Sequence, residues 1–339
     1  MIRNLYVKFR DLLPPILGGF ITKIVFKVLR KPFVKASDVP SVIRFSGNYK
    51  GGFTISADFE LGWAFRYSKT NPHPEKMAMQ SRKNFAFLIK IFEEYNIPIT
   101  WATVGHLFLN ECKKGDHDWL HRIQYFENKH WLFDKGDWFD CDPYTSWENA
   151  KSWYAPDLVE SILNSRVKHE IGCHTFSHID FSYENCPPEV AEDEIKACVY
   201  SAKKWGITLK SMVFPAGTFG NLEVLKKYGF QIYRKNMNFD MTYPFKDTFG
   251  LLVSPSSAGL GDYGFGWSIE YFLKRYKKYI DKAINTGTIC HFWLHPSIDE
   301  WFLKRIFPDI LKYAAEKREA GKLWIGTMSE IANYINRVR

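Results

Sequence analysis

Short apolar runs alternate with segments of helical periodicity along most of the chain. Residues 51–60 form an apolar run that begins at a Gly-Gly pair and are predicted to be a strand. Residues 75–97 place apolar side chains at helical spacing and predict a helix, and residues 98–108 are a second apolar run. This strand–helix–strand order predicts two parallel strands joined by a right-handed crossover.

The same alternation continues to the end of the chain. Further strands are predicted at residues 169–176, 210–217, 231–236 and 288–296. Helices are predicted at residues 156–165, 187–207, 221–230, 268–287 and 306–324, and residues 323–337 read as a strand followed by a helix. Strands that alternate with helices in this way indicate an α/β protein, either a barrel or a doubly wound sheet.

The chain divides into an extension and one large domain. With 339 residues, of which 46% are hydrophobic, it can form a sizeable core, so global disorder is excluded. We assign residues 1–50 to a basic amphipathic N-terminal extension and residues 51–339 to the barrel domain. Residues 106–165 interrupt the regular pattern and are rich in tryptophan. We expect this insertion to lie over the barrel mouth, either as an acceptor groove for sugar rings or as a cap packed by its own tryptophans.

The charge pattern bears on partners and location. The net charge is +9, but no nucleic-acid-binding motif accompanies it, so no nucleic-acid partner is expected. Residues 1–35 combine basic and apolar positions and fit an anionic membrane surface, or a helix packed on the body of the protein. Proline and glycine pairs and lysines interrupt the apolar stretch, which disfavours a spanning helix. The six cysteines contain no C-x-x-C pair and are read as reduced thiols. The expected location is cytoplasmic, peripheral at the inner membrane face.

Ionisable side chains gather where the predicted strands end, which is where α/β folds carry their chemistry. They are Asp58, Glu60, His174, His178 and His295. Two histidines and a carboxylate form a common site for a divalent metal with one open position for water. Each element has a plainer interpretation by itself, since the histidine pair could lie on a helix surface and the carboxylates could be solvated at a strand end. Together they point to hydrolysis of an amide or ester.

Four motifs in this order resemble those of the polysaccharide deacetylase (NodB-homology) family, a carbohydrate esterase type. They are "FTISADFELGW", "HEIGCHTFSHID", "MVFPAGTFG" and "CHFWLHPS", and the resemblance runs from about Phe53 to about Ser297. It implies a distorted (β/α)7-like barrel. It also implies a divalent metal, most readily Zn²⁺, and removal of N-acetyl groups from amino sugars.

The resemblance assigns roles to the residues at the strand ends. His174 and His178 would be metal ligands and His295 the general acid. The first motif departs from the family's adjacent aspartates, because here the carboxylates are spaced D-x-E on one face of a strand. Glu60 is expected as the third ligand and Asp58 as the general base, with the two roles open to exchange.

The third motif lacks the arginine that steadies the catalytic aspartate in the family. Ala216 stands near that place, and Arg234 on the next predicted strand would supply the charge, or would pair with a phosphate or a structural carboxylate. Leu294 is implied to lie beside the acetyl pocket. The residues expected to contact substrate are Trp63, Phe214, Pro215, Arg234, Trp293 and Leu294.

The sequence therefore predicts a metal-dependent N-deacetylase that acts on an N-acetylated glycan, in a surface polysaccharide or a lipid-linked sugar. Two alternatives remain. One is a hydrolase of another non-peptide C–N bond or of an O-acetyl ester. The other is an inactive barrel that binds glycan, an interpretation that the missing arginine favours.

Overall fold

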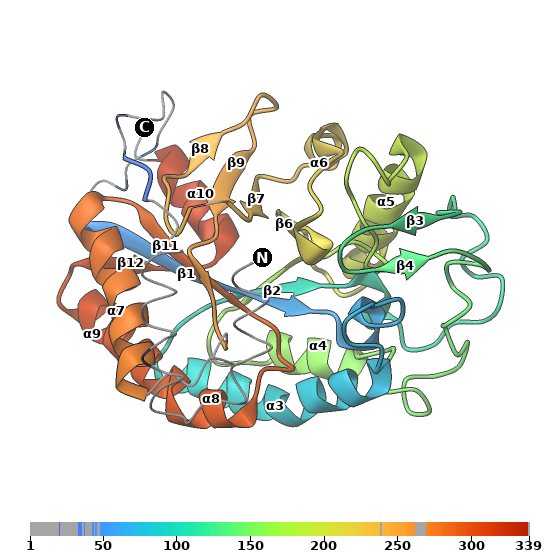
Figure 1. Ribbon diagram of the computed structural model, residues 1–339, viewed down its shortest axis with the longest axis horizontal. Helices are drawn as coiled ribbons and strands as arrows, with labels where there is room; N and C mark the ends of the chain where they lie inside the picture. Colours follow the sequence, from blue (N-terminus) through green and yellow to red (C-terminus); the bar gives the residue numbers. More distant parts are fainter. Residues whose placement is uncertain are drawn as a thin grey trace.

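The computed structural model describes residues 48–237, 239–261 and 269–337, together with residues 20, 33–35, 37, 43 and 45 (Figure 1). Most of residues 1–35, for which the sequence predicts contact with a membrane surface, lies outside the described residues. Within the described part of the chain, no helix is long and apolar enough to cross a bilayer.

Parallel strands curl into a barrel around β1 (Gly51–Phe59). β1 pairs with β2 (Thr100–Thr103) on one side and with β11 (Ile289–Leu294) on the other. From β2 the parallel order runs through β5 (Glu170–Cys173), β6 (Ser211–Val213), β7 (Ile232–Lys235) and β9 (Leu252–Pro255). The next two strand residues, β10 (Ala258–Gly259), pair with β11 and close the ring.

This closure confirms the predicted (β/α)7-like barrel and rules out the open doubly wound sheet. In the described residues, seven strand positions surround the barrel when β9 and β10 are taken as one bent strand. Two short strands add to it: β8 (Phe245–Lys246) is antiparallel to β9, and β12 (Leu323–Ile325) pairs with the start of β1. The sequence predicted none of β8, β9 or β10; β8 and β10 have two residues each, too short to show a period.

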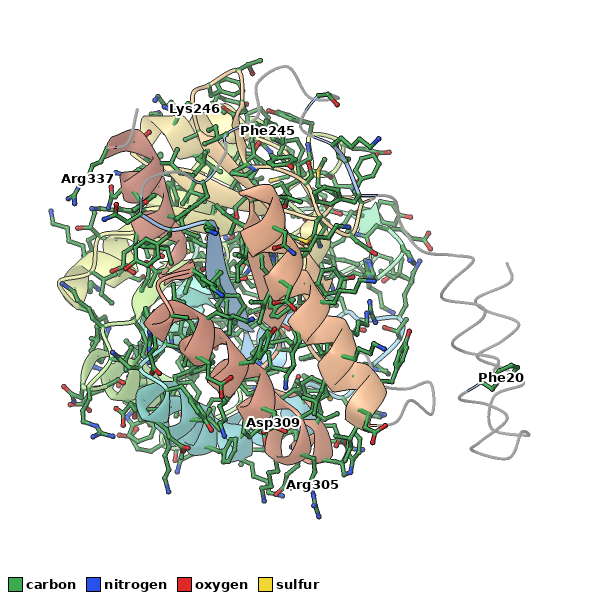
Figure 2. All side chains as sticks on the ribbon, turned by 90° about the vertical axis from the view of Figure 1, so that its left-hand side faces the viewer. Phe20, Phe245, Lys246, Arg305, Asp309 and Arg337 are labelled. Atoms are coloured by element: carbon green, nitrogen blue, oxygen red, sulfur yellow. The ribbon has the colours of Figure 1, made fainter. Side chains whose placement is uncertain are left out.

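Helices cover the outside of the barrel (Figures 1 and 2). They are α3 (Pro74–Glu94), α4 (Pro156–Leu163), α5 (Pro188–Lys204), α6 (Leu222–Lys227), α7 (Ile269–Thr286), α8 (Glu300–Arg305) and α9 (Phe307–Glu319). Proline occupies the first turn of α3, α4, α5 and α9, where its missing N–H costs no hydrogen bond. Helix α8, which the sequence did not predict, is a single short helix capped by the Asp299 side chain.

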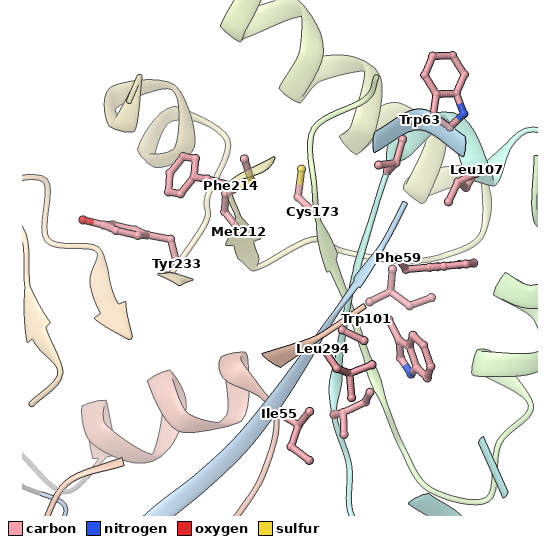
Figure 3. Packing of buried hydrophobic residues seen from close by; sticks show 14 of the residues in the cluster. Ile55, Phe59, Trp63, Trp101, Leu107, Cys173, Met212, Phe214, Tyr233 and Leu294 are labelled. Carbon is pink, nitrogen blue, oxygen red and sulfur yellow. The ribbon is translucent and has the colours of Figure 1, made fainter. Parts of the chain in front are cut away.

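The two faces of each strand enter different hydrophobic clusters. Phe53, Ile55, Ala57 and Phe59 of β1 point outward and pack under the helices, and Figure 3 shows Ile55 and Phe59 beside Trp101 and Leu294 in this layer. Inward-facing strand residues form a second cluster with the last helix, α10 (Met328–Arg337). Its barrel members are Ala102, Val213, Ile232, Leu252 and Ile289.

Helix α10 therefore plugs the amino-terminal end of the barrel with Met328, Ile331, Ala332 and Ile335. Further along the same inward faces, the side chains become polar, because β1 turns Thr54, Ser56 and Asp58 inward. The barrel interior is thus apolar at one end and charged at the other, which leaves the ionisable groups at the carboxyl ends of the strands.

The tryptophan-rich insertion is built from irregular loops, the 3-10 turn η3 (Gly105–Phe108) and a short hairpin of β3 (Phe126–Glu127) and β4 (Leu132–Phe133). Trp131, Trp138 and Trp153 are buried. The Trp131 indole N–H donates to the Ala64 carbonyl, and the Trp138 ring packs edge-on against Phe133. Of the two expectations for this segment, the placement of these rings favours packing by its own tryptophans.

The plug supplied by α10 predicts a stability effect. Replacing the fully buried Ile331 by alanine should lower the free energy of unfolding by about 2–5 kcal/mol, because it opens a cavity in the apolar end of the barrel. Asn336→Ala, at an exposed position of the same helix, is the matched control and should change little. Urea unfolding of both variants measures the difference, and equal stabilities would contradict the plug.

Candidate metal centre and active site

The end of β1 delivers two buried carboxylates to the mouth of the barrel. Asp58 lies on the inner face of β1, and Glu60 follows directly after the strand, before the 3-10 turn η2 (Leu61–Ala64). Both are almost completely buried. Oxygens of the two carboxylates and a nitrogen of His295 lie within 4.8 Å of one another. The D-x-E spacing thus brings both acids to one site, as the strand period predicts.

His174 and His178 converge on one carboxylate oxygen. The Nε2 atoms of both rings lie 3.1 Å from Glu60 Oε2, and all three residues are buried. His174 Nδ1 lies 2.7 Å from the Val213 carbonyl oxygen. A carbonyl can only accept, so Nδ1 carries a proton and donates it to Val213, and Nε2 is the ring atom that faces Glu60. Imidazole nitrogens that lie 3.1 Å from a carboxylate oxygen leave a position between them that suits a cation.

These donors fit a divalent metal. Two imidazole nitrogens and one carboxylate oxygen are the ligand set of many zinc sites with an open position. The hydrogen bond from His174 to Val213 is the kind of outer contact that orients a metal-ligating imidazole. Glu60, His174 and His178, the three residues that the sequence nominated, are thus close enough together to hold an ion.

A buried glutamate holds the loop between the two histidines, and sequence reasoning missed it. Glu194 of α5 accepts hydrogen bonds from the backbone N–H groups of Phe176 and Ser177, at 2.7 and 2.8 Å, and from the Ser177 hydroxyl. Burial raises the pKa of Glu194. Thr175 and His178 both adopt positive φ values, of 58° and 57°. Left-handed backbone is costly for such residues, so these hydrogen bonds help to keep the loop in its shape.

Arg234 pairs with Asp58 inside the barrel. Its Nη1 and Nη2 donate to the two oxygens of Asp58 at 2.6 and 2.7 Å, and both side chains are buried. Of the alternatives that the sequence left open, Arg234 thus supplies the charge that the third motif lacks. Burial by itself raises the pKa of Asp58, but the Arg234 guanidinium outweighs burial and holds the pKa of Asp58 below its ordinary value.

A chain of hydrogen bonds extends from this ion pair into the barrel. Arg234 Nη1 also donates to the Ser56 hydroxyl at 2.9 Å, and Ser56 lies 2.9 Å from His291 Nε2. His291 Nδ1 in turn contacts the Ser254 hydroxyl at 2.9 Å. Burial lowers the pKa of His291 to about 3, with a further contribution from Arg234, so the ring is neutral. This neutral network fixes Arg234 without adding another charge.

His295 sits at the outer side of the site. Its Nε2 lies 3.5 Å from Glu60 Oε1 and 3.8 Å from Asp58 Oδ2, and its side chain is 42% exposed. Trp293, which is partly exposed, places its ring 5.3 Å from the His295 ring and 5.2 Å from the Arg234 guanidinium carbon. Burial raises the pKa of Glu60, but the attraction of His295 and the hydrogen bonds of His174 and His178 lower it further than burial raises it.

The expected substrate contacts need correction at four positions. Trp63 is 1% exposed and donates its indole N–H to the Trp153 carbonyl, so it belongs to the core of the insertion. Phe214 and Leu294 lie in the hydrophobic cluster under the helices, because strand alternation turns them away from the barrel interior. Arg234 is committed to Asp58. Placement beside His295 keeps Trp293 as a candidate substrate contact.

Pro215, the remaining residue of that set, is buried at the start of the 3-10 turn η4 (Pro215–Gly217), and its carbonyl accepts from the Thr218 N–H and hydroxyl. These hydrogen bonds to the Pro215 carbonyl shape the turn that follows β6. The neighbouring Val213 carbonyl, which sequence reasoning did not single out, makes the contact to the site through His174.

The ion pair predicts a strong energetic coupling. Arg234→Met should lower the free energy of unfolding of the metal-free protein by about 3–5 kcal/mol, because it leaves a buried carboxylate without a counter-charge. Asp58→Asn/Arg234→Met should be more stable than the sum of the single changes, as urea unfolding of all four proteins would measure. Arg166→Met, which breaks an ion pair between Arg166 and Glu93 on the surface, is the control and should change stability little. Additive effects of Asp58→Asn and Arg234→Met would contradict a buried pair.

Comparison with known proteins finds a family model that matches part of this chain. Residues 79–233 match the model of the polysaccharide deacetylase family. The matched segment contains His174 and His178, whereas Asp58, Glu60 and His295 lie outside it. A search of curated protein sequences found no match.

Solved structures share the fold at low sequence identity. A protein from Mycobacterium smegmatis described as a polysaccharide deacetylase has 13% identity and a TM-score of 0.61, over 88% of this chain and 94% of that one. One from Pseudomonas aeruginosa PAO1 with the same description has 14% identity and a TM-score of 0.59, over 86% and 92%. The PuuE allantoinase has 13% identity and a TM-score of 0.57, over 87% and 93%. The family match and the shared fold confirm the resemblance of this chain to the polysaccharide deacetylase family.

Proposed function

We propose that this protein is a metal-dependent hydrolase that removes an N-acetyl group from an amino sugar of a surface polysaccharide or a lipid-linked glycan. The observation that carries the proposal is the convergence of Glu60, His174 and His178 beside Asp58 and His295 at the barrel mouth. The family match supports the reaction class. Glycan as the substrate class follows from that family.

Glu60, His174 and His178 would hold the ion, and Zn²⁺ is the metal that their nitrogen and oxygen donors suit best. When bound, such an ion polarises the acetyl carbonyl and lowers the pKa of a neighbouring water. His178 supports this role, because burial lowers the pKa of its ring to about 4 and keeps a lone pair available near neutral pH.

Asp58 is suited to take the proton from the attacking water. Its lowered pKa keeps it ionised at neutral pH, and Arg234 fixes the orientation of the carboxylate. A carboxylate held by a buried arginine is a weaker base, so its contribution depends on a water that is already acidic. The same pairing weakens the argument for an inactive barrel, because Arg234 supplies the charge that the third motif lacks.

His295 is suited to give a proton to the departing amine. It is partly exposed, lies within 4 Å of both carboxylates, and reaches the site from the opposite side to His174 and His178 (the ends of β11 and β5). Water attack on the acetyl carbon breaks the C–N bond, and the products are acetate and the free amine. The Trp293 ring beside His295 offers a flat apolar surface on which a sugar ring could stack.

Hydrolysis of a cyclic amide is the second candidate. The fold of the PuuE allantoinase matches this chain nearly as well as those of the two deacetylase-like proteins, with a TM-score of 0.57 against 0.61 and 0.59. Because fold alone supports this reading, the substrate assay has to distinguish the two reactions.

The proposal predicts metal-dependent acetate release from N-acetylated chitooligosaccharides. Zn²⁺-loaded wild-type protein should release acetate, and Asp58→Asn and His295→Asn should each lower kcat/KM by about 10²–10⁴-fold because each removes a proton-transfer group. Asp309→Asn, at an exposed position on the outer helix α9 (Figure 2), is the control and should keep full activity.

The substrate panel also includes an O-acetylated xylan and allantoin. Release of acetate from the xylan alone, or ring opening of allantoin alone, would replace the N-deacetylase with the corresponding hydrolase. Glycan binding without turnover by the metal-loaded protein would instead leave a binding barrel.

A further inference from the structure

A second group of metal-ligating side chains lies in the tryptophan-rich insertion, apart from the catalytic residues. We call it the cysteine cluster, and it consists of His106, Cys112, His117 and Asp142. All four residues are buried, and one ligand atom from each lies within 4.8 Å of the others. They come from η3, from the loop that follows it and from the loop that precedes α4, so the chain folds back on itself to bring them together.

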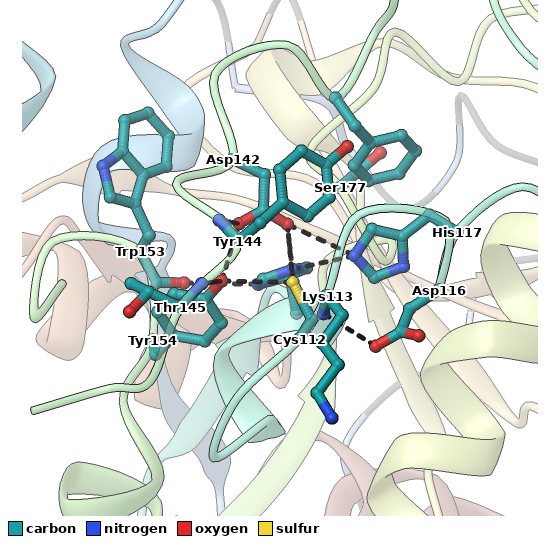
Figure 4. Close-up of polar contacts among 12 residues, drawn as sticks. Cys112, Lys113, Asp116, His117, Asp142, Tyr144, Thr145, Trp153, Tyr154 and Ser177 are labelled. Carbon is teal, nitrogen blue, oxygen red and sulfur yellow. Dashed lines mark hydrogen bonds and ion pairs between the residues drawn. The ribbon is translucent and has the colours of Figure 1, made fainter. Parts of the chain in front are cut away.

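The cluster converges on one oxygen atom. Asp142 Oδ2 lies 2.8 Å from His106 Nε2, 3.3 Å from His117 Nε2 and 3.0 Å from the sulfur of Cys112 (Figure 4). The two imidazole nitrogens are themselves 3.2 Å apart. A carboxylate oxygen has two lone pairs, so hydrogen bonds from all three atoms would exceed its capacity, and protons on both Nε2 atoms would repel each other.

The spacing of these atoms suits a tetrahedral ion. Around zinc, with bonds of about 2.0–2.3 Å, ligand atoms lie about 3.3–3.6 Å from one another. Here the separation is 3.7 Å between the Cys112 sulfur and His106 Nε2 and 3.2 Å between the two imidazole nitrogens. The contacts of Asp142 Oδ2 are slightly shorter or equal, and an ion at the centre would spread them outward.

The surroundings orient the ligands as outer contacts do in metal sites. The second oxygen of Asp142 accepts from the Tyr154 hydroxyl at 2.6 Å and from the Tyr144 N–H at 3.1 Å, which leaves Oδ2 for the cluster. His106 Nδ1 faces the Trp153 carbonyl at 3.4 Å, so its proton is on that side and Nε2 offers a lone pair. These outer contacts orient Asp142 and His106 so that Oδ2 and Nε2 point to the centre of the cluster.

We propose that the cysteine cluster binds a structural zinc ion. Four protein ligands complete a tetrahedron and leave no open position for water, and the burial of all four excludes substrate, so the site is structural. One thiolate and two imidazoles favour zinc over magnesium or calcium, which prefer oxygen ligands.

The ion would fasten the insertion to the barrel next to the active site. His106 follows β2, and its ring lies 4.4 Å from the ring of Trp63 in the turn after Glu60. The same insertion reaches the active-site loop, because the Trp131 ring lies 5.1 Å from the His178 ring and Trp138 donates to the Ser177 hydroxyl at 2.7 Å. Binding would thus stabilise a wall of the first metal centre without taking part in its chemistry.

Cobalt substitution distinguishes the two centres, because the cysteine cluster is the one that contains sulfur. Wild-type protein loaded with Co²⁺ should show a thiolate-to-cobalt charge-transfer band in the near ultraviolet. Cys112→Ser should lose the band, whereas Cys141→Ser, in the same loop and one residue from Asp142, should keep it. A cobalt-loaded wild-type protein without the band would overturn the proposal.

Metal counting by mass spectrometry completes the test and does not depend on Cys112 variants folding. Wild-type protein should bind two equivalents of Zn²⁺, and His174→Ala/His178→Ala should retain one, which Co²⁺ replacement should show to be thiolate-bound. If the double variant keeps one sulfur-bound ion but the wild-type protein releases no acetate, the proposed function is wrong and the second site stands. Loss of all metal from the double variant would sink the second site alone.

Discussion

The rest of this structure depends on the burial of two carboxylates at the mouth of the barrel. The carboxylates of Asp58 and Glu60 are buried at the end of β1, so each needs a counter-charge or hydrogen bonds inside the protein. Asp58 finds Arg234, and Glu60 finds His174 and His178. This division separates the two acids, because Asp58 is paired with a cationic side chain whereas Glu60 faces two imidazoles that could hold a metal ion with it.

The alternation of strand faces explains how both demands are met in one fold. Outward-facing strand residues pack in the hydrophobic cluster under the helices. Inward-facing residues are apolar near α10 and polar at the mouth of the barrel. Ser56, His291 and Ser254 lie between these layers and pass hydrogen bonds to Arg234. An apolar floor beneath a polar network lets the barrel hold charge without exposing its core to water.

The insertion gives the active site a wall that the barrel cannot supply. Trp131 and Trp138 pack against Phe126 and contact the loop that carries His178, and the cysteine cluster joins the segment that follows β2 to Asp142. A long irregular segment has few backbone contacts of its own, so cross-links between distant side chains set its shape. A metal ion bound by four side chains would be a strong cross-link for such a segment, because its binding free energy stabilises the folded state.

The sequence by itself determined most of the alternation of strands and helices and placed Asp58, Glu60, His174, His178 and His295 at strand ends, because those features are local or periodic. The barrel class came from the resemblance of its motifs to a known family, since the alternation alone left a doubly wound sheet open. Tertiary structure alone decided the rest. It paired Arg234 with Asp58 across 176 positions of sequence and turned Phe214 and Leu294 away from the site. It also gathered the cysteine cluster, whose members show no recognised spacing. Contacts of this kind depend on how loops and strand faces meet in space, which no local pattern encodes.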